Sequence, residues 1–135
     1  MRETLSRASL FLAGLLILLS AFLHGLVNVP HLHEDLVEIG VRPTLLGAVM
    51  LVLYFSVVAM FAFGLLVLWN AGSALRGRPL QLAPLWIIAA TYVAFGIAAF
   101  VLVSPTHHVL GYAVMGVLVA GGAALRPAPV GTPIL

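Results

Sequence analysis

The longest uncharged stretch of this chain lies between Arg78 and Arg126. A helix needs about 20 apolar residues to cross the roughly 30 Å hydrocarbon layer of a bilayer, and this stretch is more than twice that long. It must therefore fold back on itself. The break is expected at Ser104-Pro105-Thr106, because serine caps helices and proline suits their first turn. The stretch predicts two membrane spans, residues 82–103 and 106–125.

Two earlier apolar runs, residues 8–27 and 44–69, have the length of further spans. The composition agrees, since 63% of the residues are hydrophobic and 7% are charged, whereas soluble domains carry about 25% charged residues. We therefore predict an all-α integral membrane protein, a bundle of four transmembrane helices arranged as two antiparallel hairpins. Residues 1–126 would form this single domain, followed by a proline-rich tail at 127–135.

The arginines predict how the chain lies in the membrane. Arg42 alone falls on one side of the four-span arrangement. The other side holds Arg2, Arg7, Arg76, Arg78 and Arg126. Short cytoplasmic loops carry an excess of arginine and lysine, so we expect a multi-pass protein of the cell inner membrane with both termini in the cytoplasm. Membrane lipid is then its immediate partner.

The segment between the first two spans, residues 24–40, has the pattern of a short helix. Pro30 suits an early helical position and Gly40 a helix stop. Apolar residues recur at helical spacing, at Leu32, Leu36 and Ile39. The opposite face would carry His31, Glu34, Asp35 and Glu38. This pattern predicts a short amphipathic helix lying on the outer membrane surface between spans one and two.

All five histidines fall at the predicted outer end: His24, His31, His33, His107 and His108. Neutral imidazoles are ligands for zinc, copper or haem iron, and nearby carboxylates can support them. Histidines can also exchange protons with a quinone. The candidate cofactor-binding residues are His24, His107 and His108. The candidate metal ligands are His24, His31, Glu34, Asp35 and His107.

A purely structural interpretation competes with this site. His31 and His33 would then be solvated, and the histidine pair at 107 and 108 would anchor a helix at the membrane interface. The structural interpretation fits His24 least well, because an ionisable side chain inside a span is a functional candidate by default. No His-Glu-x-x-His sequence or other catalytic motif is present. The absence of cysteine excludes iron–sulfur clusters, and the absence of a basic stripe argues against nucleic-acid binding.

Small residues inside the predicted spans indicate how helices could pack in lipid, where association depends on close backbone approach. The third span carries Ala90, Ala94 and Ala98 at four-residue spacing. Glycines mark the fourth, at Gly111, Gly116, Gly121 and Gly122, while Gly47, Ser56 and Ala59 lie in the second. Tyr54, Tyr92 and Tyr112 bring hydroxyls that each need a hydrogen-bond partner or the membrane interface.

These features lead to two functional expectations. The first is a small accessory or assembly subunit of a larger inner-membrane complex, respiratory, photosynthetic or oxygenase-like, which contacts other membrane subunits through its glycine and alanine faces and its tail. A homo-oligomer would use the same faces. The alternative is a small membrane enzyme or cofactor-binding protein, with an outward-facing histidine and acid site for a metal, haem, quinone or lipid.

Overall fold

The computed structural model describes residues 1–102 and 109–125, and within them the secondary structure is helical, without strands. In chain order the helices are α1 (Arg2–Leu23), the short π-helix η1 (His24–Asn28), α2 (Val29–Glu38), α3 (Pro43–Leu75), α4 (Leu82–Leu102) and α5 (Leu110–Ala124). The predicted all-α class is confirmed for this part of the chain. The predicted interhelical break at 104–106 and the tail at 127–135 lie outside the described residues.

Within residues 1–102 and 109–125, three helices are long and apolar enough to cross a membrane, namely Arg2–Glu38, Pro43–Leu75 and Leu82–Leu102. The fourth apolar helix, α5, has 15 described residues, fewer than the roughly 20 that a span needs. The predicted start of the fourth span falls at residues that the structure does not describe. Membrane character is therefore supported, while the number of crossings stays a prediction.

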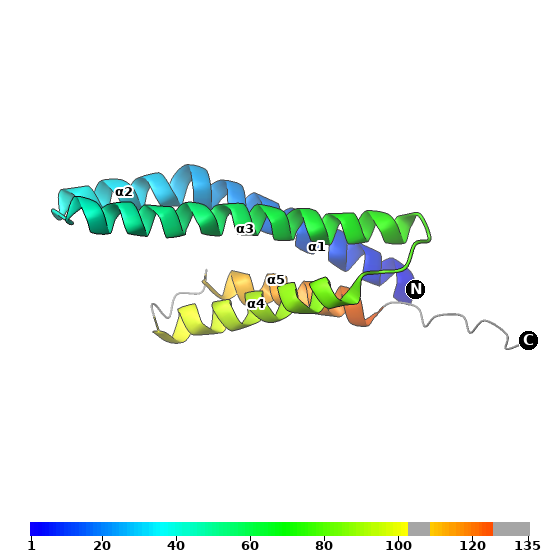
Figure 1. The fold of residues 1–135 in the computed structure, drawn as a ribbon. Helices are drawn as coiled ribbons and strands as arrows, with labels where there is room; N and C mark the ends of the chain where they lie inside the picture. Colours follow the sequence, from blue (N-terminus) through cyan, green and yellow to red (C-terminus); the bar gives the residue numbers. More distant parts are fainter. Residues whose placement is uncertain (103–108, 126–135) are drawn as a thin grey trace, which may run out of the picture.

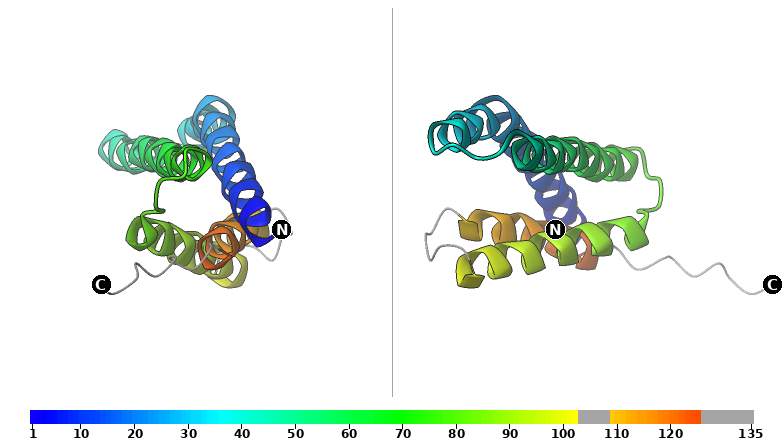
Figure 2. Two further views of the ribbon diagram at one scale, coloured as in Figure 1. Left: turned by 90° about the vertical axis from the view of Figure 1, so that its right-hand side faces the viewer. Right: turned by 60° about the vertical axis from the view of Figure 1, so that its left-hand side comes forward.

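The helices form two antiparallel pairs (Figure 1). The long pair consists of α3 and the continuous helix that α1, η1 and α2 form, and the short pair consists of α4 and α5. Contact between α1 and α5 holds the pairs together, whereas α3 and α4 touch little. End views show the long pair stacked over the short pair (Figure 2). This arrangement leaves space between α3 and α4 for the cleft described below.

Two hydrogen bonds join α1 to α5 across the bundle. Ser6 Oγ donates to the Gly122 carbonyl at 2.6 Å, and Ser9 Oγ donates to the Leu118 carbonyl at 2.7 Å. In lipid such bonds replace the water that a hydroxyl would otherwise need. They also place the beginning of α1 beside the end of α5, so these two helix termini lie at one end of the molecule (Figure 1).

Glycines bring helix backbones together at the contacts that build the bundle. A Cβ on Gly96 would lie 2.5 Å from the Ala113 backbone nitrogen, and one on Gly116 would lie 2.7 Å from the Ala89 carbonyl oxygen. Only residues without a side chain allow α4 and α5 to approach this closely. The buried core next to these contacts contains Leu10, Ile17, Val67, Leu85, Ile88 and Val119.

The segment predicted as a separate surface helix differs from that prediction. It is helical, but α2 follows α1 and η1 without a break in the helix, at an angle to α1, and packs along α3 (Figures 1 and 2). Pro30 lies in the first turn of α2, directly after the π-helix, whose wider turn accommodates a residue that lacks an N–H and crowds the preceding turn. The helix does end before Gly40, whose φ of 74° suits a glycine stop as predicted.

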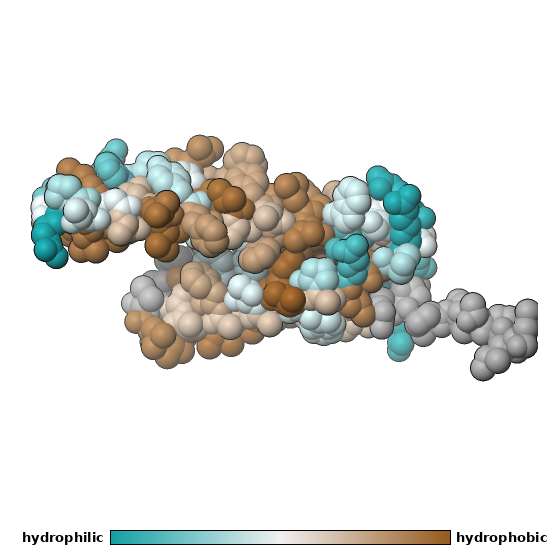
Figure 3. Space-filling view, viewed as in Figure 1, coloured by the Kyte–Doolittle hydropathy of each residue, from teal (hydrophilic) through white to brown (hydrophobic). Residues whose placement is uncertain are grey.

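The outer surface of the bundle is largely apolar. Large side chains such as Leu51, Phe55 and Val101 are at least 70% exposed. Exposing so much apolar surface is unfavourable in water but not in lipid. Hydrophilic residues gather near the two ends of the long helix pair, and hydrophobic residues cover much of the length between them (Figure 3). This distribution is the one expected of a protein that crosses a bilayer.

Candidate functional site

A cleft of about 290 Å³ lies where α3 and α4 diverge. Its lining residues come from η1, α3, α4 and α5: His24, Val52, Phe55, Ser56, Ala59, Met60, Phe63, Thr91, Tyr92, Phe95 and Tyr112. The walls are mostly apolar, with a few hydroxyls and one imidazole. Small-molecule sites commonly have this character, with volumes of about 300–1,000 Å³, and the volume of this cleft is close to the lower limit of that range.

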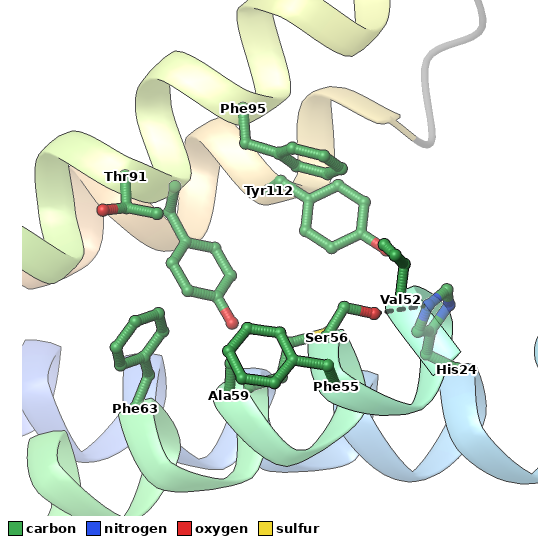
Figure 4. A pocket seen from close by; sticks show the side chains of 11 residues that line it. His24, Val52, Phe55, Ser56, Ala59, Phe63, Thr91, Phe95 and Tyr112 are labelled. Carbon is green, nitrogen blue, oxygen red and sulfur yellow. Dashed lines mark hydrogen bonds between the residues drawn. The ribbon is translucent and has the colours of Figure 1, made fainter. Parts of the chain in front are cut away.

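His24 is held at one side of the cleft by Ser56 of α3. The two side chains are joined by a hydrogen bond of 3.3 Å between His24 Nε2 and Ser56 Oγ (Figure 4). Ser56 Oγ donates its own hydrogen to the Leu53 carbonyl at 2.7 Å. Since a hydroxyl has one hydrogen to donate, Ser56 Oγ accepts from His24 Nε2 when it donates to Leu53. In that arrangement the neutral imidazole carries its proton on Nε2, and Nδ1 is the acceptor.

The second nitrogen of His24 and one tyrosine hydroxyl are left without partners. His24 Nδ1 and Tyr92 Oη are both buried, and neither makes a hydrogen bond within the described part of the chain. Tyr92 is only 3% exposed. Leaving a buried polar group unsatisfied costs about 1–3 kcal/mol. A bound molecule that accepts from Tyr92 and donates to His24 would satisfy both groups.

Aromatic rings form much of the cleft wall. Tyr92 lies 6.3 Å from Tyr112 and 6.4 Å from Phe63, measured between ring centroids. Phe95 packs edge-on against Tyr112 at 5.0 Å. Viewed from close by, Phe55 and Phe63 extend from α3, while Phe95 and Tyr112 extend from the opposite side of the cleft (Figure 4). Rings at these separations can enclose a planar group by edge and face contacts.

Among the predicted ligands that the structure describes, His24 lines this cleft, and the others do not. His31, Glu34 and Asp35 are exposed on α2. Ten residues separate Glu34 from His24 along the continuous helix, roughly 15 Å at about 1.5 Å per residue. No group of three histidine, cysteine or acidic residues that could hold a metal occurs among the described residues. His107 and His108 lie outside them, so the predicted metal and haem sites remain predictions.

The sequence pattern predicts Ser56 as a helix-packing residue and does not identify partners for Tyr92 and Tyr112. In the structure all three side chains line the cleft. The available signal was the presence of hydroxyl groups inside apolar spans, where each hydroxyl needs a hydrogen-bond partner. Knowing which hydroxyls face His24 required the register between α3, α4 and α5, and helical spacing within one span does not contain that information.

Comparisons of the chain with protein-family models, with curated proteins and with solved structures found no match.

Proposed function

We propose that this chain is a four-span inner-membrane protein, with both termini in the cytoplasm, that binds a lipid-soluble quinone in the cleft between α3 and α4. One observation carries this proposal. The cleft contains a buried donor, Tyr92 Oη, and a buried acceptor, His24 Nδ1, that have no partner among the described residues. A quinone carbonyl can accept from Tyr92 Oη but cannot donate to His24 Nδ1, whereas the hydroxyls of the reduced quinol can do both, so the two oxidation states share the contact with Tyr92 and the quinol adds the contact with His24.

The shape and walls of the cleft support the same ligand class. A volume of about 290 Å³ accommodates a single-ring head group better than a large cofactor. The rings of Phe55, Phe63 and Phe95 offer apolar contacts to a planar molecule. A lipid-soluble ligand would reach the cleft from the bilayer, and its tail would remain among the lipid chains outside α3 and α4.

Copurification tests the proposal with a matched pair of variants. The protein is extracted in mild detergent, and its bound small molecules are identified by solvent extraction, mass spectrometry and visible absorption. Wild type and His31→Leu should contain the same quinone, because His31 is exposed on α2 and outside the cleft. His24→Leu should contain little of it. Equal quinone content in His24→Leu and His31→Leu, or no quinone in wild type, would contradict the proposal.

A second candidate function is the accessory or assembly subunit, and one surface favours it. Ala90, Ala94 and Ala98 are all exposed along α4, unlike the glycines that already bring α4 and α5 together. Small residues at four-residue spacing let another membrane helix approach closely. Native mass measurement should then find the 14.2 kDa chain in a larger heteromeric particle, and Ala94→Phe should release it. A monomer in both samples would argue against this role.

A further inference from the structure

A second cavity lies at the opposite end of the long helix pair from the turn between α2 and α3. Its volume is about 390 Å³, and it is lined by Thr4, Arg7, Ala8, Phe11, Ala71 and Leu75. Arg7 and Thr4 of α1 are the polar lining residues, and the other lining residues of α1 and α3 are apolar or small. A cavity whose wall has a polar part and an apolar part matches a molecule that has a charged head and a hydrocarbon chain.

Arg7 has donor capacity that the protein does not use. Its Nη2 donates to Glu3 Oε1 one helical turn away, and pairs of this type near the surface stabilise a helix only weakly. Its Nε is buried and makes no hydrogen bond to any described residue. A guanidinium presents its donors as a planar fork that can bind two oxygens of a phosphate together. Arg7 lines the cavity, and its guanidinium has donors beyond the one that it gives to Glu3.

The charge around the cavity favours an anion. Arg2, Arg76 and Arg78 are exposed at the same end of the bundle, and Arg76 directly follows the cavity residue Leu75. Glu3 is the acidic residue that lies next to Arg2 in the sequence, so positive side chains outnumber negative ones at this end. Basic pockets between membrane helices bind anionic lipid head groups, and each arginine near an anionic surface adds attraction.

We propose that this cavity between α1 and α3 binds an anionic phospholipid. The lipid phosphate contacts Arg7 and Thr4, while Arg76 and Arg78 add positive potential around it. One acyl chain lies against Ala8, Phe11 and Ala71, where the two alanines leave room for it. This site is separate from the His24 cleft and does not depend on the quinone proposal.

Native mass spectrometry of the detergent-purified protein tests this site with phosphatidylglycerol and phosphatidylcholine of identical acyl chains. Wild type should retain phosphatidylglycerol preferentially. Arg7→Gln should bind it about tenfold more weakly, as expected for the loss of a hydrogen bond between charged groups. Arg2→Gln removes the same charge from a residue outside the cavity and should largely retain the preference.

A cavity-filling variant separates lipid binding from folding defects. Ala8→Leu keeps every arginine, lies at an exposed position that lines the cavity, and occupies the space proposed for the acyl chain, so it should also lose the bound phosphatidylglycerol. Three results would overturn the proposal: equal retention of the two lipids by wild type, equal losses in Arg7→Gln and Arg2→Gln, or full retention by Ala8→Leu. Inorganic phosphate should not displace the lipid, because it lacks the acyl chain, and efficient displacement would also contradict a lipid site.

Discussion

Tyr92 carries a buried hydroxyl without a partner among the described residues, and it therefore affects the empty and the ligand-bound protein differently. Tyr92→Phe removes an unsatisfied group that costs about 1–3 kcal/mol, so the empty variant should be at least as stable as wild type. Its affinity for a short-chain benzoquinone should fall about 2–10-fold, because one hydrogen bond of about 0.5–1.5 kcal/mol is lost. Thermal unfolding in detergent, with and without the quinone, measures both effects.

A clear loss of stability in empty Tyr92→Phe would show that the hydroxyl already has a partner in the protein. Unchanged quinone affinity would show that Tyr92 does not contact the quinone.

Among single residues of the cleft, His24 could be predicted from the sequence, because an imidazole within an apolar span is a functional candidate by itself. Its contact with Ser56 was not predictable, since it depends on how η1 lies against α3.

At the scale of helices, the long apolar runs predicted the elements well because composition and length alone decide whether a helix suits a membrane. The third predicted span, 82–103, nearly coincides with α4, whereas α3 extends beyond the predicted 44–69 to Pro43–Leu75. The sequence pattern does not predict that α2 continues from α1. Proline favours the start of a new helix at Pro30, but the π-turn before it lets the helix continue.

Glycines at helix contacts give a prediction at this scale. Gly96→Ala should lower the stability of the bundle by about 1–3 kcal/mol, because its Cβ would meet the Ala113 backbone at 2.5 Å. Gly47→Ala is the matched control, since no atom lies within 4 Å of the added Cβ. Alanine is favoured over glycine within helices by about 0.5–1 kcal/mol, so this control should be neutral or stabilising. Thermal unfolding in detergent compares them, and equal stability of the two variants would contradict the packing of α4 on α5.

At the scale of the whole molecule, the arginine distribution predicts the orientation, and the absence of cysteine makes it easy to measure. Ile39→Cys places a thiol at the turn between α2 and α3, where Ile39 is 74% exposed. Pro79→Cys places one in the exposed connection between α3 and α4. A membrane-impermeant maleimide should label the first in intact cells and the second only after permeabilisation. Labelling of both from outside would show that α3 does not cross the membrane.

The central claim, a quinone site between α3 and α4, is tested most directly by titrating the purified protein with a short-chain benzoquinone in equilibrium dialysis. Ala59 lines the cleft, while Ala62 is exposed on the same helix outside it. Wild type and Ala62→Trp should bind the quinone saturably with the same affinity, and Ala59→Trp should show no saturable binding because its indole fills the cleft. Saturable binding that survives Ala59→Trp, or none in wild type, would contradict the account.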